Sequence, residues 1–275
     1  MHILITNDDG VTAPGLLALA QAMRQFGQVS IVAPDHDWSG YGHTKHFKRP
    51  LRIEEVTLKD GTHAFATDGS PADCVALAAM GLLDTPIDIV LAGINSAANV
   101  GYDLTYSGTV AAVKEAMIWR IPGIAFSLDV QRKPDPNYSL AAAVACQVMH
   151  TIIDRNLPTD TSLNVNVPNI PTQHFRGFQI TRTGHRVYRD NLEIRTDPRG
   201  NSYFWIGGDV PVGIPQEGTD IGALALGYAS ITPLQLDYTD YNKIPMLMNW
   251  DTNASQPIPV SANGKTRETA VPLAV

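Results

Sequence analysis

Cysteine is scarce in this chain, with Cys74 and Cys146 the only two among 275 residues. They lie far apart in apolar segments of helical pattern, so we expect two reduced, buried thiols rather than a disulfide or a zinc site. The eight histidines form no His-Glu-x-x-His pair, which argues against a zinc hydrolase. A chain of this length buries about three quarters of its unfolded surface, so it needs no covalent staple.

Long apolar runs are also missing. No segment approaches the ~20 consecutive apolar residues of a membrane span. The first ten residues enter a strand-like run directly, without a basic leader and a long apolar core. We therefore expect a soluble, cytoplasmic protein that has no membrane partner.

Positive charge is in deficit, because 20 Lys and Arg face 27 Asp and Glu and leave a net charge of -7. This balance argues against a protein that coats a nucleic-acid polymer. Hydrophobic residues make up 44% of the chain and charged residues 17%, which is typical of a folded globular protein. The length corresponds to one large domain or to a domain with an appendage.

Strand-like and helix-like segments alternate over residues 1–171. Ser70 is placed to cap a helix, with Pro71 at its first position and Asp73 as the returning acid of a capping box. The alternation predicts an α/β fold with a mainly parallel, doubly wound sheet covered on both faces. The expected strands are His2–Thr6, Gln28–Ala33, Ile87–Ala92, Gly123–Leu128 and Leu163–Val167, with a hairpin of Leu51–Val56 and His63–Thr67; the expected helices are Leu16–Phe26, Pro71–Leu83, Gly108–Trp119 and Leu140–Asp154.

The pattern changes after Pro171. Strand-like arms at Gly177–Arg182, Ser202–Gly207 and Leu224–Thr232 follow one another without intervening helices. We interpret residues 172–250 as an antiparallel hairpin extension that serves oligomerisation and also completes the core of residues 1–171. Residues 251–275 have no clear period, and we expect a flexible tail there.

Polar side chains follow three of the expected strands. Asp8 and Asp9 follow the first strand, Ser39 lies in the loop after the second, and Asn95 follows Ile87–Ala92. Ligands bind at the carboxyl ends of the strands in such sheets, so these loops should converge. Two neighbouring carboxylates in a crevice are costly unless a cation or protons neutralise them, although an isolated Asp-Asp-Gly also suits a solvated turn. The four side chains carry hard oxygen donors, which suit Mg²⁺ or Mn²⁺.

A second element of chemical interest is the start of the expected helix at Gly108. Ser107, Gly108 and Thr109 place small residues at a helix N-terminus, where backbone N–H groups and the helix dipole favour an anion. Ser107 alone also suits a plain N-cap. An adjacent cation favours a phosphate at this position.

Two stretches are locally basic, and several aromatic residues lie in the loops near the expected site. His43–Arg52 and Arg182–Arg189 either rim a pocket for a polyanionic substrate or form solvated faces. The loop aromatics either stack on a nucleotide base or pack within their own loops: Trp38, Tyr41 and Tyr102.

Six sequence blocks occur in order along the chain. They are Ile-Thr-Asn-Asp-Asp-Gly-x-x-Ala-Pro-Gly at 5–15, Val-Ala-Pro-Asp-x-x-x-Ser-Gly at 32–40, Gly-x-Pro-x-Asp-Cys-Val at 69–75, Gly-Ile-Asn at 93–95 with Asn99 and Gly101, Tyr-Ser-Gly-Thr-Val-x-Ala at 106–112, and Gly-Tyr-x-Ser-Ile-Thr-Pro-Leu at 227–234. With these blocks the chain resembles the SurE (survival protein) family of metal-dependent nucleotidases.

The resemblance implies a three-layer Rossmann-like core with a C-terminal hairpin used in dimer or tetramer formation. It implies a phosphomonoesterase that releases phosphate from nucleoside 5′-monophosphates, with 3′-monophosphates and short polyphosphate as further substrates. One divalent ion per subunit, Mg²⁺ or Mn²⁺, is implied. By this match Asp8 and Asp9 are catalytic. The implied metal ligands are Asp8, Asp9, Ser39 and Asn95. The implied phosphate-binding residues are Ser107, Gly108, Thr109 and Asn99.

The chain departs from the family pattern in two loops. His36-Asp37-Trp38 stands where the family commonly has Arg-Asn-Arg, and Ala97 replaces a glycine. These changes leave the expected metal ligands in place and bear on substrate range and turnover, and Asp37 could supply a further metal oxygen. The alternatives to the nucleotidase are an aspartyl-phosphate phosphatase, a non-catalytic nucleotide- or Mg²⁺-binding module, and an assembly protein that uses the extension.

Overall fold

The structure, a computed structural model, describes residues 1–130, 135–155 and 157–250. The expected flexible tail at 251–275 lies outside the described residues. Residues Met1–Leu236 form one compact unit, and Asp237–Val275 form a second, whose described part carries the single-turn helix α6 (Ile244–Leu247). The expected boundary at residue 171 stays a prediction.

The first unit is built on a nine-stranded sheet with the strand order β3-β4-β2-β1-β5-β6-β7-β11-β8. The six central strands from β4 to β7 run parallel, whereas β3 is antiparallel to β4 and β11 is antiparallel to β7. The strands are β1 (His2–Thr6), β2 (Gln28–Pro34), β3 (Ile53–Thr57), β4 (His63–Thr67), β5 (Ile89–Asn95), β6 (Gly123–Asp129), β7 (Ser162–Pro168), β8 (Phe178–Ile180) and β11 (Ala229–Leu234).

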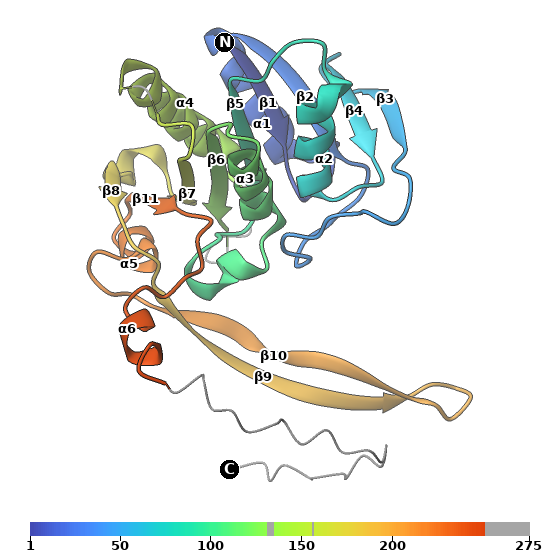
Figure 1. The fold of residues 1–275 in the computed structure, drawn as a ribbon, viewed down its shortest axis with the longest axis vertical. Helices are drawn as coiled ribbons and strands as arrows, with labels where there is room; N and C mark the ends of the chain where they lie inside the picture. Colours follow the sequence, from blue (N-terminus) through green and yellow to red (C-terminus); the bar gives the residue numbers. More distant parts are fainter. Residues whose placement is uncertain (131–134, 156, 251–275) are drawn as a thin grey trace. The chain divides into compact units, whose positions relative to one another are not determined.

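Helices cover both faces of this sheet, as Figure 1 shows. Successive strand residues point to opposite faces, so Ile3 and Ile5 of β1 pack with α1 and α4, while Leu4 packs with α2 and α3. All five residues of β1 are buried. The expected α/β architecture with a mainly parallel sheet is confirmed. The helices of this unit are α1 (Pro14–Met23), α2 (Pro71–Leu77), α3 (Gly108–Ile118), α4 (Tyr138–Arg155) and α5 (Asp220–Ala225), with short helical turns η1 (Arg24–Phe26), η2 (Ala78–Leu82), η3 (Gly101–Thr105) and η4 (Thr172–His174).

The expected elements of residues 1–171 are confirmed, with local differences. The helix expected over Leu16–Phe26 ends at Met23 and continues as the turn η1. The helix expected to run through Leu83 ends at Leu77 and continues as the wider turn η2, where Gly81 has a φ of 112° that no regular helix accepts. The strand β5 runs on to Asn95 and so carries one of the candidate site residues itself. The predicted capping box of α2 is present, with Ser70 and Asp73 each accepting the other's backbone N–H.

The segment after Pro171 differs from the prediction at two elements, one of which is the helix α5. The helix α5 separates the last two strands, where an unbroken series of strand arms was expected, and Leu224 belongs to this helix. Thr219 starts it by accepting the N–H of Gly222 at 3.0 Å. Gly222 is required there, because a Cβ on it would lie 2.0 Å from the carbonyl oxygen of Gln216. The strand β11 then completes the sheet beside β7, as expected.

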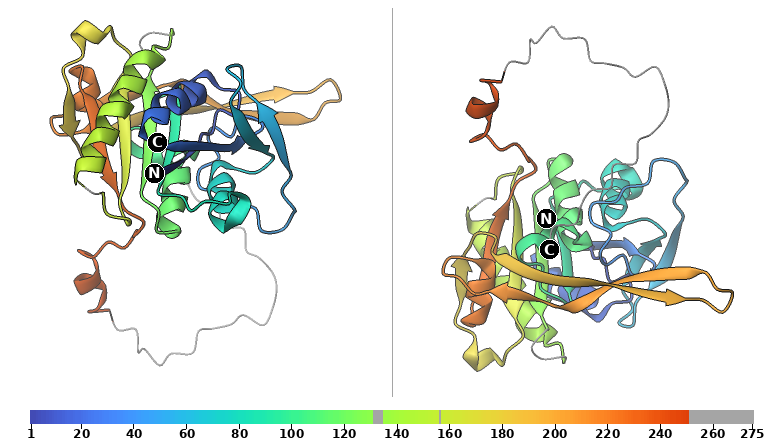
Figure 2. Two further views of the ribbon diagram at one scale, coloured as in Figure 1. Left: turned by 90° about the horizontal axis from the view of Figure 1, so that it is seen from above. Right: turned by 90° about the horizontal axis from the view of Figure 1, so that it is seen from below.

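A long antiparallel hairpin stands apart from the nine-stranded sheet. Its strands are β9 (His185–Thr196) and β10 (Ser202–Ile214), and within the part of the chain that the structure describes they pair only with each other. Figure 2 shows this two-stranded arm extending beyond the helices and strands of the core in both views. Ser202–Gly207 was expected as a strand, whereas β9 was missed.

Two further expectations concern the thiols and the membrane. Cys74 and Cys146 are both free, as expected, but Cys146 is partly exposed rather than buried. Among the described residues no helix has the length and apolar character needed to cross a bilayer.

Candidate active site

The loop after β1 brings the two candidate acids to the carboxyl edge of the sheet. The side-chain amide of Asn7 donates to the carbonyl of Gly10 at 2.8 Å and closes the turn. Gly10 has a φ of 99°, which a glycine adopts without strain. Asp8 is only 3% exposed at this position, and Asp9 beside it is half-buried.

Asp8 lies against the N-terminus of α3. Its carboxylate accepts the hydroxyl hydrogen of Thr109 and also a bond from the Thr109 backbone N–H. The closeness depends on Gly108, because a Cβ there would lie 2.8 Å from Cβ of Asp8 and 3.0 Å from its Oδ2. Thr109 thus holds Asp8 in place, and the expected phosphate contact of Thr109 stays a prediction.

The two acids are in an environment that disfavours their charged forms. Burial raises the pKa of Asp8, against the opposing hydrogen bonds from Thr109. Burial, followed by the negative charges of Asp8 and Asp37, raises the pKa of Asp9 to about 7. A bound divalent cation would remove this cost. The acid pair with its hard oxygen neighbours therefore fits a metal ion of the Mg²⁺ or Mn²⁺ type.

The loops after β2 and β5 meet the acid pair, as predicted. The backbone N–H of Trp38 donates to the carbonyl of Asp8 at 2.8 Å. The backbone N–H of Ser96 bonds to the carboxylate of Asp9. Three loops that lie far apart in the sequence therefore converge at one edge of the sheet.

The two neutral candidate ligands are Ser39 and Asn95. Asp37 accepts both the N–H and the hydroxyl hydrogen of Ser39, at 2.7 and 2.5 Å. The amide nitrogen of Asn95 donates to the carbonyl of Ala97 at 2.7 Å, which leaves its amide oxygen to ligate. No group of three or more His, Cys, Asp or Glu side chains suited to a metal occurs within the described ranges. The candidate site thus has two carboxylates, completed by a hydroxyl and an amide.

The remaining phosphate-site candidates are Ser107 and Asn99. Ser107 caps α3 by accepting the N–H of Val110 at 3.1 Å. The side-chain amide of Asn99 donates to the hydroxyl of Ser127 at 2.8 Å, deep in the protein. The Asn99 backbone is also anchored, since its N–H and carbonyl are hydrogen-bonded by side chains of β7. Asn99 therefore secures the loop between β5 and α3, and its contact with phosphate stays a prediction.

The loop aromatics divide into two groups. Trp38 is 8% exposed, and its ring lies 5.1 to 5.4 Å from those of His36, Tyr41 and His46, so it packs within the loop. Tyr41 and Tyr102 are 63% and 52% exposed and are the ones accessible to a base.

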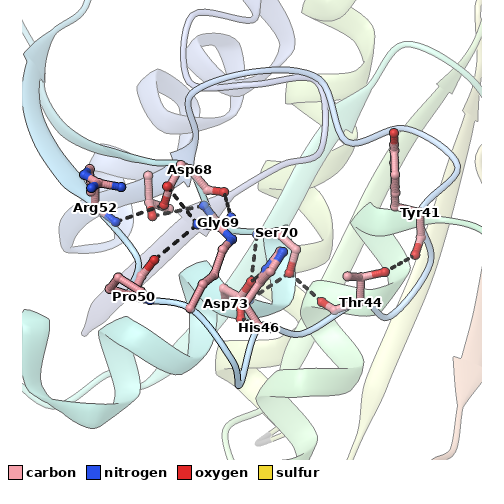
Figure 3. Close-up of polar contacts among 11 residues, drawn as sticks. Tyr41, Thr44, His46, Pro50, Arg52, Asp68, Gly69, Ser70 and Asp73 are labelled. Atoms are coloured by element: carbon pink, nitrogen blue, oxygen red, sulfur yellow. Dashed lines mark hydrogen bonds and ion pairs between the residues drawn. The ribbon is translucent and has the colours of Figure 1, made fainter.

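The basic stretch His43–Arg52 is largely consumed by internal ion pairs. Lys45 and His43 both donate to Glu115 of α3, at 2.5 and 2.9 Å. His46 binds Asp73 at 2.7 Å. Asp68 accepts the backbone N–H of Arg52 at 2.9 Å, and the hydroxyl of Ser70 donates to the carbonyl of Thr44 at 2.5 Å, as Figure 3 shows. The basic side chains of this stretch therefore hold the loop in place through ion pairs, instead of forming an open basic rim around a pocket.

The second basic stretch is also partly fastened. Arg186, 8% exposed, forms an ion pair with Asp103 in η3, and Tyr188 donates to the same carboxylate at 2.5 Å. His185 meets the hydroxyl of Tyr102 at 2.9 Å. These contacts hold the base of the hairpin against the loop that leads into α3.

Two residues at this edge escaped the sequence analysis. Tyr138 is within electrostatic reach of Asp9: burial, followed by the charge of Asp9, raises the pKa of its phenol. Glu115 is a buried acid in the middle of α3. A charged residue on the apolar side of a predicted helix is the signal that could have indicated Glu115, whereas no sequence signal places Tyr138 near Asp9.

The chain matches the model of the family described as survival protein SurE over residues 3–190. It belongs to the SurE family.

Full-length relatives of the SurE family carry one shared name. The chain is 48% identical over 247 residues to the 5′-nucleotidase SurE of Herpetosiphon aurantiacus, which covers 90% of this chain and 97% of the relative. It is 45% identical over 251 residues to the 5′-nucleotidase SurE of Chloroflexus aggregans, covering 91% and 99%. A crystal structure of the SurE protein of Aquifex aeolicus matches with a TM-score of 0.76 and 36% identity, covering 90% of this chain and 98% of that one.

Proposed function

We propose that this protein hydrolyses nucleoside 5′-monophosphates to nucleoside and phosphate. The observation that carries the proposal is the buried Asp8 beside Asp9, packed against the N-terminus of α3. Acids that bind a cation and a helix start that favours an anion are the two halves of a phosphate-ester site. The name shared by the SurE relatives, 5′-nucleotidase, supports the same enzyme class.

The proposed metal site consists of Asp8, Asp9, Ser39 and Asn95 and holds one divalent ion, Mg²⁺ or Mn²⁺. When bound, such an ion supplies positive charge to a phosphoryl oxygen and acidifies a water molecule. The raised pKa values of both acids support the assignment, because they show the cost of two uncompensated charges at this position.

The remaining roles follow from position. Asp9 is half-buried and faces Ser96 rather than the helix, so we assign to it the orientation of the attacking water and the acceptance of its proton. Asp8, fixed by Thr109, holds the cation at the helix N-terminus. The amide of Gly108 and the hydroxyl of Ser107 stabilise the equatorial phosphoryl oxygens, where negative charge is spread in the transition state. Asn99 anchors this loop through its hydrogen bond to Ser127 of β6.

The same site accepts a nucleoside 3′-monophosphate or short polyphosphate if the phosphate alone is recognised. The protein acts as a homodimer or homotetramer joined through the β9–β10 hairpin. This part of the proposal is supported by the exposed apolar side chains of the hairpin.

The test is phosphate release from a panel of 5′- and 3′-monophosphates and polyphosphate, with Mg²⁺, Mn²⁺ or EDTA. We expect metal-dependent release that the Asp9→Asn variant loses by several orders of magnitude, with an unchanged melting temperature. The matched control is Asp84→Asn, an exposed acid that precedes β5 at the opposite end of that strand. Near-full activity of Asp9→Asn would contradict the assignment.

The alternatives predict other results in the same assay. A binding module would retain nucleotide and release no phosphate under any metal condition. An aspartyl-phosphate phosphatase would yield a covalent phosphate on Asp8 after rapid quenching. An assembly protein would be indifferent to loss of the acid pair.

A further inference from the structure

Asp37 is an exposed acid that the proposed mechanism does not use, yet it touches a proposed ligand. One oxygen of its carboxylate accepts the backbone N–H of Ser39 at 2.7 Å and the Ser39 hydroxyl at 2.5 Å. The pair closes a three-residue turn whose middle residue is Trp38, and the backbone N–H of Trp38 is bonded to Asp8. Asp37 is therefore fixed relative to the acid pair through its neighbours.

The hydrogen bond decides which way the Ser39 hydroxyl can act. A hydroxyl has one hydrogen and two acceptor lone pairs. Because its hydrogen is directed to Asp37, both lone pairs point away from that carboxylate. Ser39 is thereby prepared as an acceptor, which is the form that ligates a cation.

Asp37 also contributes charge. The next residue, Trp38, is hydrogen-bonded to Asp8 through its backbone N–H at 2.8 Å, so the negative charge of Asp37 is held near the acid pair. Among the described residues Asp37 does not group with Asp8 and Asp9 into a set of three side chains that could hold a metal, and its own oxygen is engaged by Ser39. Its charge acts across space and through partly solvated surroundings, where screening by salt is effective.

We propose that Asp37 is a positioning residue that strengthens divalent-cation binding at Asp8, Asp9, Ser39 and Asn95 in two separable ways. It orients the Ser39 hydroxyl, and it adds a third negative charge to the edge of the site. The inference rests on the proposed metal site. It also predicts an order of binding, because the negative charge of Asp37 repels a phosphate dianion until the cation is present.

Two substitutions separate the two effects. Asp37→Asn keeps an oxygen that accepts from Ser39 and removes only the charge, whereas Asp37→Ala removes both. Asp84→Asn is the control, because it removes the same charge from an exposed position before β5. Asp37 is exposed, so the variants should fold, and matching melting curves establish this.

The measurement is isothermal titration of Mn²⁺ into EDTA-stripped, desalted protein at low and at high ionic strength. We expect Asp37→Asn to bind Mn²⁺ about threefold to tenfold more weakly than the unaltered protein at low salt, with the gap closing at high salt. Asp37→Ala should be weaker still, and its deficit relative to Asp37→Asn should persist in salt. Without metal, Asp37→Asn should bind a nucleoside monophosphate more tightly than the unaltered protein.

The outcomes distinguish this inference from the function on which it rests. If the unaltered protein shows no Mn²⁺ binding, both the metal site and the role of Asp37 are overturned. If it binds Mn²⁺ and Asp37→Asn binds equally well at low salt, only the charge effect is overturned. Equal affinities of Asp37→Asn and Asp37→Ala would overturn the orientation of Ser39.

Discussion

Gly108 determines how closely Asp8 approaches α3. A methyl group at this position would lie 2.8 Å from Cβ of Asp8 and 3.2 Å from Cγ of Pro71. Alanine is otherwise a better helix former than glycine, by about 1 kcal/mol in a helix interior, so the substitution costs the helix itself nothing. We expect Gly108→Ala to displace Asp8 and to lower kcat/KM about 10²-fold, as misplacements of about 1 Å do.

The activity of the Gly108→Ala variant should fall much more than its stability. The melting temperature should change by only a few degrees, since the displaced acid is itself costly to bury. Thr109→Val removes the hydroxyl bonded to Asp8 and keeps the shape of the side chain, and it should also lower kcat. A Gly108→Ala protein with unaltered kcat/KM would show that the position of Asp8 is not critical.

At the scale of elements, Glu115 ties the loop after β2 to α3. It is 1% exposed and accepts from Lys45, His43 and Trp119, at 2.5, 2.9 and 2.9 Å. Hydrogen bonds to a charged group contribute about 1.5–3 kcal/mol, so we expect Glu115→Gln to lower the free energy of unfolding at pH 7 by about that amount. Urea unfolding measures it, with the exposed Glu54→Gln as control.

The same contact makes a prediction about pH. Burial alone would raise the pKa of Glu115, but the bonds from His43, Lys45 and Trp119 outweigh it and hold the pKa at about 2, below the ordinary 4.5. A depressed pKa stabilises the folded state above 4.5, and this stability is lost as the pH falls toward 2. The difference in unfolding free energy between the unaltered protein and Glu115→Gln should therefore shrink over that interval. A difference that is constant with pH would mean that the pKa of Glu115 is the same in the folded and the unfolded protein, so that its bonds do not depress it.

The elements that the sequence predicts well are those with a strong apolar pattern. β1 has the apolar centre Ile3-Leu4-Ile5, and the two acids follow it after Asn7, so both the strand and its place at the ligand-binding edge could be predicted. The ion pair between Lys45 and Glu115 could not be predicted, because the two residues are 70 positions apart and come close only after folding. β9 escaped because a strand exposed on both faces needs no alternation of apolar and polar residues.

At the scale of the whole molecule, the hairpin leaves one apolar face uncovered within the first unit. Leu192 lies opposite Ile206 and Ile194 opposite Phe204, so the four side chains share a face. They are 60%, 84%, 63% and 59% exposed. A two-stranded ribbon is marginally stable by itself, and a face of this kind requires a partner. The proposed occupant is a second copy of this chain, because the proposed dimer would place the same apolar face on both molecules.

The test of this assembly is the mass in solution, measured by light scattering after gel filtration. The unaltered protein should have at least twice the mass of one chain, and the double variant Phe204→Asp/Ile206→Asp should shift to a smaller species, because assembly would bury two charges. Tyr203→Asp, on the other face of β10, should leave the mass unchanged. If the smaller species keeps full nucleotidase activity, each active site is complete within one chain, whereas lost activity would show that the site depends on the partner. An unaltered protein that runs as a single chain would contradict the assembly itself.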